Sequence, residues 1–97
     1  MKSEYQNLII LKLRKLRMEK KFSQKEIAEL LGISNGQMGN IESPHTKNKY
    51  TLQQIYTICT ELKLPIEQIF IEDEELSTGK EIINLLISKI IKYNERQ

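Results

Sequence analysis

The sequence predicts an all-α protein built around one modest core, and three observations support this. Apolar residues recur at helical spacing almost throughout the chain. Five of these segments are preceded by a capping box, in which Ser or Thr is followed three residues later by Glu or Gln. The 97 residues suffice for one domain and not for two, and no stretch alternates with period two long enough to predict a strand.

The apolar spacing predicts six helices in chain order. Their apolar residues are Tyr5, Ile9, Leu13 and Leu16 in a first helix over about residues 4–20; Ile27, Leu30 and Leu31 in a second; Met38 and Ile41 in a third; Leu52, Ile55, Ile58, Cys59 and Leu62 in a fourth; Ile66, Ile69 and Phe70 in a fifth, opened by Pro65; and Ile82, Ile83, Leu86, Ile87, Ile90 and Ile91 in a sixth over about residues 79–94.

Boundary signals agree with these helices. Gly32 supplies the left-handed position after the second helix, and Pro44 ends the third. Residues 43–51 form the one substantial loop, and residues 72–78 form an acidic hinge. The capping boxes are Ser3/Gln6, Ser23/Glu26, Ser34/Gln37, Thr51/Gln54 and Thr78/Glu81.

Composition excludes several classes of protein. Cys59 is the only cysteine, so no disulfide within the chain is expected, and its apolar neighbours indicate a buried thiol. The longest apolar run, Leu8 to Leu11, is too short to span a membrane, and no secretion signal is recognised. No catalytic or metal-binding motif occurs. We therefore expect a cytoplasmic, nucleoid-associated protein that is not an enzyme and has no metal or cofactor.

The net charge of +2 is unevenly distributed along the chain. Residues 1–71 contain 11 basic and 7 acidic side chains, whereas residues 72–97 contain 4 basic and 6 acidic ones. The basic surplus lies mainly in the first quarter and indicates an anionic partner. We expect a binding domain over residues 1–71, followed by an acidic hinge and an amphipathic helix over residues 72–97.

The second and third helices are joined by only Gly32, Ile33 and Ser34, which is typical of a helix-turn-helix. A small residue, Ala28, stands where the two helices would cross and lets their backbones approach. The apolar residues expected to form their shared core are Ile27, Leu31, Ile33, Met38 and Ile41.

The stretch SQKEIAELLGISNGQMGNIES resembles the DNA-binding unit of the lambda-repressor-like family, of the Cro/CI or XRE type. The resemblance extends over about residues 8–70, because TLQQIYTICTELKLPIEQIF is similar to that family's fourth and fifth helices. It implies a five-helix domain with the helix-turn-helix at about residues 24–43, plus a sixth helix. The third helix would enter the major groove of duplex DNA. The residues on which the resemblance rests are Gln24, Ala28, Gly32, Ile33, Ser34, Met38, Ile41 and Glu42.

Candidate DNA contacts lie on the side of the third helix opposite Met38 and Ile41, where the residues are small or carry amides. The base contacts expected are Asn35, Gly36, Gln37 and Asn40. The phosphate contacts expected, partly from the resemblance, are Gln24, Ser34, Ser43, Lys47, Asn48 and Lys49. All of these residues could instead be ordinary solvated surface.

Gly36 and Gly39 depart from the family pattern and weaken the third helix by about 1 kcal/mol each. Either close approach to DNA compensates for them, or the helix orders fully only when bound. The resemblance also implies an ion pair between Arg17 and Glu42, which would hold the end of this helix.

The sixth helix has an apolar stripe too broad to remain in water. It packs on its own chain, on a second copy or on both, and we expect a homodimer that reads a palindromic operator as a repressor. An antitoxin-like module with an unidentified protein partner is the alternative, and membrane-surface binding by the basic first helix is a further one. The dimer residues expected are Ile83, Leu86, Ile87 and Ile90.

Overall fold

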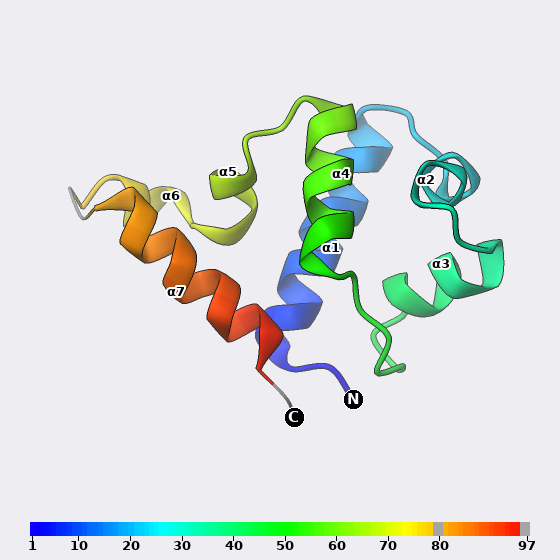
Figure 1. Ribbon diagram of the computed structural model, residues 1–97, viewed down its shortest axis with the longest axis horizontal. Coiled ribbons are helices and arrows are strands. Elements are labelled where there is room, and N and C mark those ends of the chain that lie inside the picture. Colours follow the sequence, from blue (N-terminus) through cyan, green and yellow to red (C-terminus); the bar gives the residue numbers. More distant parts are fainter. Residues whose placement is uncertain (79–80, 96–97) are drawn as a thin grey trace.

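The computed structural model describes residues 1–78 and 81–95, and all regular structure in this part of the chain is helical (Figure 1). The prediction of an all-α fold is therefore confirmed. The helices are α1 (Glu4–Glu19), α2 (Gln24–Leu31), α3 (Asn35–Glu42), α4 (Leu52–Leu62), α5 (Ile66–Phe70), α6 (Asp73–Leu76) and α7 (Ile82–Asn94).

Capping boxes with Ser or Thr begin four of these helices, as the sequence predicted. At α2, the Ser23 hydroxyl accepts from the Glu26 backbone N–H at 3.0 Å, and the Glu26 carboxylate accepts from the Ser23 N–H at 2.9 Å. The same reciprocal pair begins α1 at Ser3, α3 at Ser34 and α4 at Thr51. Each box satisfies backbone donors that have no partner within the helix.

The start of α7 and the acidic segment differ from the predictions. The expected box at Thr78/Glu81 is wrong, because the Thr78 hydroxyl donates to the Glu75 carbonyl and Glu81 is itself the N-cap residue of α7. The expected start of this helix at residues 79–80 lies outside the described residues. The segment expected to be a plain hinge contains α6, whose acidic first turn suits the positive end of the helix dipole.

One hydrophobic core joins the helices (Figure 1). In that view α2 and α3 lie to the right of α4, and α5, α6 and α7 lie to its left. The C-terminal helix contributes Tyr93, whose fully buried ring meets Phe70 edge-on with centroids 5.9 Å apart. The buried core residues are Ile9, Ile10, Leu13, Ile27, Ala28, Met38, Ile41, Tyr50, Ile55, Ile58, Cys59, Leu62, Ile69, Phe70, Ile71 and Tyr93.

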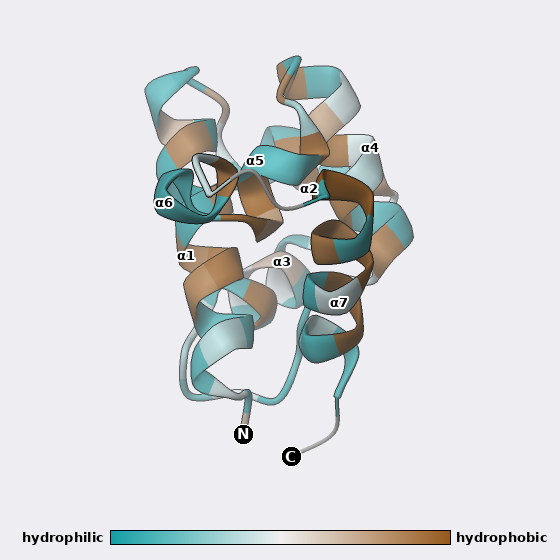
Figure 2. Cartoon of the chain, turned by 90° about the vertical axis from the view of Figure 1, so that its left-hand side faces the viewer, coloured by the Kyte–Doolittle hydropathy of each residue, from teal (hydrophilic) through white to brown (hydrophobic). Residues whose placement is uncertain are grey.

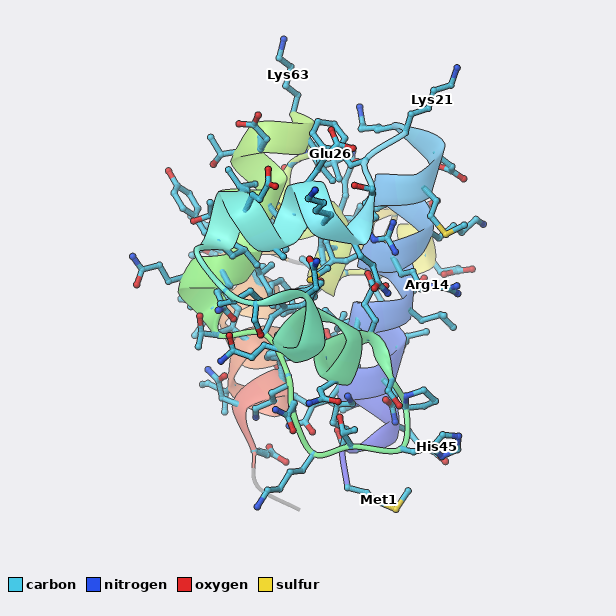
Figure 3. All side chains as sticks on the ribbon, turned by 90° about the vertical axis from the view of Figure 1, so that its right-hand side faces the viewer. Met1, Arg14, Lys21, Glu26, His45 and Lys63 are labelled. Carbon is cyan, nitrogen blue, oxygen red and sulfur yellow. The ribbon has the colours of Figure 1, made fainter. Side chains whose placement is uncertain are left out.

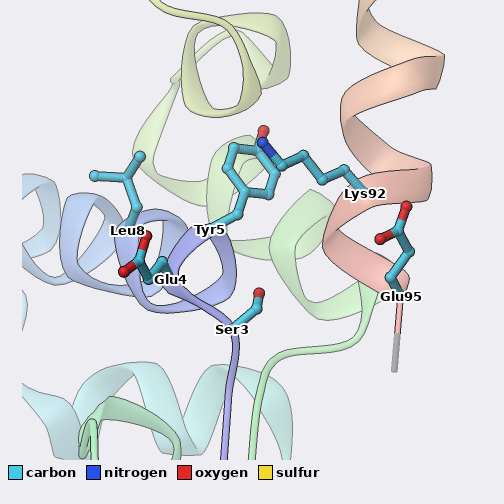
Figure 4. Close-up of a pocket in the computed structure, with 6 residues that line it drawn as sticks. All are labelled: Ser3, Glu4, Tyr5, Leu8, Lys92 and Glu95. Carbon is cyan, nitrogen blue, oxygen red and sulfur yellow. The ribbon is translucent and has the colours of Figure 1, made fainter. Parts of the chain in front are cut away.

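Hydrogen bonds connect the start of α1 to the end of α7. Gln6 is buried, and its side-chain amide donates to the backbone carbonyls of Tyr93 at 2.7 Å and Glu95 at 2.9 Å. Beside it, the Lys92 ammonium lies 4.7 Å from the ring centroid of Tyr5 across a hollow between the helices (Figure 4). These contacts fix the start of α1, and with it the short N-terminal arm that reaches the site described next.

Candidate nucleic-acid interface

A tight left-handed turn connects α2 to α3. Gly32 ends α2 with a φ of +69°, a conformation that glycine adopts without a steric cost. The next backbone N–H, of Ile33, donates to the Ala28 carbonyl at 3.0 Å and closes the turn. Ala28 and Met38 are buried where the two helices meet. The predicted helix-turn-helix is therefore present in the structure.

The outer side of α3 is open to solvent. Figure 3 faces α2 and α3, with the loop of His45 below them. The Gln37 side-chain oxygen accepts from the Ser34 N–H at 2.9 Å, which fixes the amide of Gln37 at the start of the helix. The Ser34 hydroxyl is likewise used, because it accepts from the Gln37 N–H at 3.0 Å. The exposed residues of this side are Asn35, Gly36, Gln37 and Asn40.

The two glycines of α3 have no evident role in the fold. A Cβ atom on Gly36 would lie 3.8 Å from the Ser34 hydroxyl oxygen, which is an ordinary contact, and one on Gly39 would meet nothing within 4 Å. The helix runs without interruption through both residues. Alanine would therefore fit at either position, and the missing side chains leave room for an approaching surface.

An ion pair holds the C-terminal end of α3, at the residues that the sequence indicated. Arg17 donates to both carboxylate oxygens of Glu42, from Nε at 2.7 Å and Nη2 at 2.8 Å. Its Nη1 donates to the Phe22 carbonyl at 2.8 Å. The Gln24 amide, expected at a phosphate, donates to Glu42 at 2.8 Å in this structure. The carboxylate thus connects α3 to α1 and to the start of α2.

The pKa of Glu42 lies below its ordinary value. Burial of the carboxyl opposes its ionisation, but the hydrogen bonds from Arg17 and Gln24 and the positive charges of Arg17 and Arg14 outweigh that cost. The side chains of Glu42 and Arg17 are 3% and 9% exposed. Removing either partner would leave the other as a buried charge without compensation.

On the loop after α3, some of the residues expected to contact phosphate are exposed, whereas others are partly buried or bonded within the protein. Lys47 and Asn48 are exposed, whereas Ser43 and Lys49 are half-buried. The Lys49 ammonium donates to the Tyr93 carbonyl at 3.3 Å and lies 5.4 Å from the centroid of the Tyr93 ring. In this structure Lys49 is therefore directed at the end of α7, and Lys47 is the loop lysine that is exposed.

The role of Lys2 could not be predicted from the sequence. It is one of the basic residues of the first quarter, yet it is only 6% exposed, and its ammonium lies at the end of α3 and in the loop. Burial lowers its pKa. Buried lysine is rare, and nothing in the identity of a lysine near a chain end distinguishes it from a solvated one.

The predicted dimer residues of α7 divide into two pairs. Leu86 and Ile90 are half-buried against the core of their own chain. Ile83 and Ile87 are 66% and 51% exposed, and Ile91 continues this row at 59%. Figure 2 shows the hydrophobic segments along α7 and along α1. The helix thus packs on its own domain and still presents an apolar row to solvent.

A comparison with known protein families identifies the family to which this arrangement of helices belongs. A family model described as a helix-turn-helix domain matches residues 11–82, which is well over half of the chain. The chain belongs to this helix-turn-helix family. Searches of curated proteins and of solved structures found no match. Within the described residues, no helix of this helix-turn-helix protein is both long enough and apolar enough to cross a membrane. A helix-turn-helix domain indicates a DNA-binding regulator.

Proposed function

We propose that the protein is a sequence-specific transcriptional regulator of the lambda-repressor-like, Cro/CI or XRE type, which represses by occupying a promoter as a homodimer. It would act in the cytoplasm, at the nucleoid. The observation that carries this proposal is the exposed side of α3, which combines amides with Gly36 and is uncharged. The Arg17–Glu42 pair, itself part of the family resemblance, keeps that side in one orientation.

Base recognition would come from the amides of α3. Asn35, Gln37 and Asn40 are exposed there. An amide can bond bidentately to N6 and N7 of adenine in the major groove, whereas Gln37, whose oxygen accepts from Ser34, would contact a base through its nitrogen. Gly36 would let the helix backbone approach the bases closely. We therefore expect few direct base contacts, made mainly by amides.

Phosphate contacts would surround this side. The first turns of α2 and α3 offer backbone N–H groups without a partner inside the helix, near Gln24 and Ser34. The loop adds Ser43, Lys47 and Asn48, and Lys49 would contribute if its ammonium turned from α7 to a phosphate. Such contacts fix the register of the protein and give binding its salt dependence.

Selection of bound sites from a pool of random duplexes tests the main proposal. We expect a palindromic consensus, because a two-fold dimer reads two equal half-sites about one helical turn or a multiple apart. The helices α7 and α3 lie toward opposite sides of a molecule whose longest dimension is 40 Å (Figure 1). A dimer through α7 therefore favours well-separated half-sites. Recovery of no consensus, with no affinity for any duplex, would refute sequence-specific binding.

Two variants separate base from phosphate contacts. Asn40→Ala should cost about 1–3 kcal/mol on the selected site and little on random DNA. Lys47→Ala should weaken binding to both by the same factor and lower the salt slope by about one. Lys15→Ala is the matched control, because Lys15 is an exposed lysine on α1. Equal losses on both DNAs for Asn40→Ala, or a salt slope unchanged by Lys47→Ala, would remove the corresponding assignment.

The dimer is tested at the exposed row of α7. Ile83→Glu with Ile87→Glu should give monomers in sedimentation, because two charges would be buried at the interface. Leu11→Glu, at an exposed leucine of α1, is the control that should remain dimeric. The same exposed row also supports the second candidate function, a module with a heterologous protein partner. A monomeric wild-type chain that selects no duplex would favour that candidate.

A further inference from the structure

Lys2 connects the N-terminal arm to the end of α3 and to the loop that follows it. Its ammonium donates to the carbonyl oxygens of Ile41 at 2.9 Å, Ser43 at 2.6 Å and Asn48 at 2.6 Å. The Thr46 hydroxyl lies at 3.4 Å from the same nitrogen. Three short bonds to carbonyls use all three protons of an ammonium group, so this side chain is fully engaged.

Two of these carbonyls belong to the C-terminal end of α3. The last carbonyls of a helix have no partner within it, and the helix dipole makes this end negative. The buried ammonium of Lys2 donates to the carbonyls of Ile41 and Ser43 and places a positive charge at the negative end of the dipole. Arg17 holds the same end of the helix through the Glu42 side chain. The end of α3 is therefore held from two independent directions.

The third carbonyl closes the loop. Ser43 and Asn48 stand at either end of the segment that contains Lys47, and both carbonyls converge on one nitrogen. The Thr46 hydroxyl donates to the Asn40 carbonyl and adds a bond between loop and helix. Figure 3 shows Met1 and His45 at the same end of the molecule, where the arm meets the loop. The position of Lys47 relative to α3 thus depends on the side chain of Lys2.

The arm is itself fixed at its base. Ser3 caps α1 together with Gln6, and the Gln6 amide donates to the carbonyls of Tyr93 and Glu95 at the end of α7. Lys2 therefore extends from an anchored position and is not a mobile tail. Hydrogen bonds therefore connect the end of α7 to Gln6 and Gln6 to Ser3, and the ammonium of the neighbouring Lys2 continues this connection to the loop.

We propose that Lys2 is a positioning residue for DNA binding, which sets the distance between the base-reading side of α3 and the phosphate contact of Lys47. This inference rests on the proposed function. It assigns to a buried lysine of the arm a role that neither the helix-turn-helix motif nor the positive charge of the arm provides. The charge of Lys2 acts on the protein backbone, and DNA is affected only through α3 and the loop.

Lys2→Met tests the proposal, since it removes the ammonium and keeps an unbranched side chain. Lys12→Met is the matched control, because the Lys12 ammonium also donates to helix-end carbonyls, at Gln68 and Ile69 of α5. We expect Lys2→Met to lose at least tenfold in affinity for the selected site while circular dichroism shows an unchanged helix content. Lys12→Met should bind as the wild type does.

A double-mutant cycle distinguishes positioning from a general loss of stability. If Lys2 acts through the loop, Lys47→Ala should lower the salt slope by about one in the wild type and have little further effect in Lys2→Met. Exchange of the backbone amides of residues 43–49 should be faster in Lys2→Met. Normal affinity of Lys2→Met, or full additivity of the two substitutions, would overturn the proposal.

Two further outcomes keep the test decisive. If Lys2→Met does not fold, Lys2→Arg replaces it in the same cycle: its planar guanidinium cannot satisfy three carbonyls that converge on one point, so reduced coupling to Lys47 is expected, and full coupling contradicts the proposal. If the wild type binds no duplex, the proposed function fails, and with it any role of Lys2 at DNA. Faster exchange of the backbone amides of residues 43–49 in Lys2→Met would in that case show only that Lys2 stabilises α3 and the loop.

Discussion

Replacing the two glycines of α3 by alanine should make the protein more stable and a weaker DNA binder. In the free protein the new Cβ atoms fit: the nearest contact at Gly36 is 3.8 Å, and Gly39 has no neighbour within 4 Å. Both residues lie inside a regular helix. Glycine at these two positions lowers the stability of the helix, and no packing contact within the chain compensates for this. Any compensation must therefore come from a molecule that binds to α3.

The expected stabilisation follows from helix propensity. Each substitution should raise the free energy of unfolding by about 1 kcal/mol, which for a domain of this size corresponds to about 4–8 °C in Tm. At the DNA, an added methyl group moves α3 away from the bases and lengthens its amide contacts. Loss of one such contact costs about 1–3 kcal/mol, so we expect a loss of affinity for the selected site of about 5- to 150-fold.

Thermal denaturation and fluorescence anisotropy with a labelled duplex measure the two effects on the same samples. Thr60→Ala is the control, because it raises helix propensity at an exposed position near the end of α4 that lies away from α3 (Figure 1). It should increase stability with unchanged affinity. Alanine variants of α3 that are more stable and bind DNA as tightly as the wild type, or more tightly, would refute close approach as the reason for the glycines.

Three further predictions concern the stability and reactivity of the fold. Glu42→Gln should cost about 3 kcal/mol at pH 7 in urea denaturation, because it leaves the buried charge of Arg17 unpaired. The folded pKa of Glu42 is lowered, so this difference should be complete above the ordinary pKa of a glutamate and shrink as the pH falls through the lower folded value; a constant difference down to pH 3 would contradict the assignment. Burial raises the pKa of Cys59 to about 11, so only about one thiol in a thousand is ionised at pH 8, and a disulfide reagent should label it in urea but not in the native protein. Lys63→Gly should stabilise the protein by about 0.5–1 kcal/mol, since Lys63 ends α4 at a φ of +57°; destabilisation would show that its side chain matters more than backbone strain.

Local signals made much of the fold predictable. Helix starts could be read because a capping box is a contact over three residues, and four of the five predicted boxes are present. The turn at Gly32 could be read because a left-handed position favours glycine. Lys63 and Lys21 adopt the same backbone region, and the sequence could not show this, since lysine has no preference for it.

The parts that could not be predicted depend on contacts between distant segments. The pattern of apolar residues identified the stripe of α7, but only packing decides that Leu86 and Ile90 turn inward while Ile83 and Ile87 remain exposed. The same limit applies at the candidate site. A family pattern pointed to Arg17 and Glu42, whereas the burial of Lys2 depends on carbonyls 39 to 46 residues away, which carry no signature in the sequence.

The structure also changes what the basic surplus means for DNA binding. Much of it is committed within the protein: Arg17 pairs with Glu42, Lys2 binds backbone carbonyls, and Lys12 lies against α5 and Glu72. A phosphate neutralised on duplex DNA contributes about 0.9 to the slope of log K against log salt.

With Lys47 as the exposed loop lysine of each copy, a dimer should therefore show a slope of about −2 to −4, far below what 11 basic residues in residues 1–71 would suggest. Titrations from 50 to 300 mM salt on the selected site measure it. A slope near −10 would mean that the lysines and arginines of α1 and α2 face the DNA, and that the amides and helix ends of α3 are not the main source of affinity.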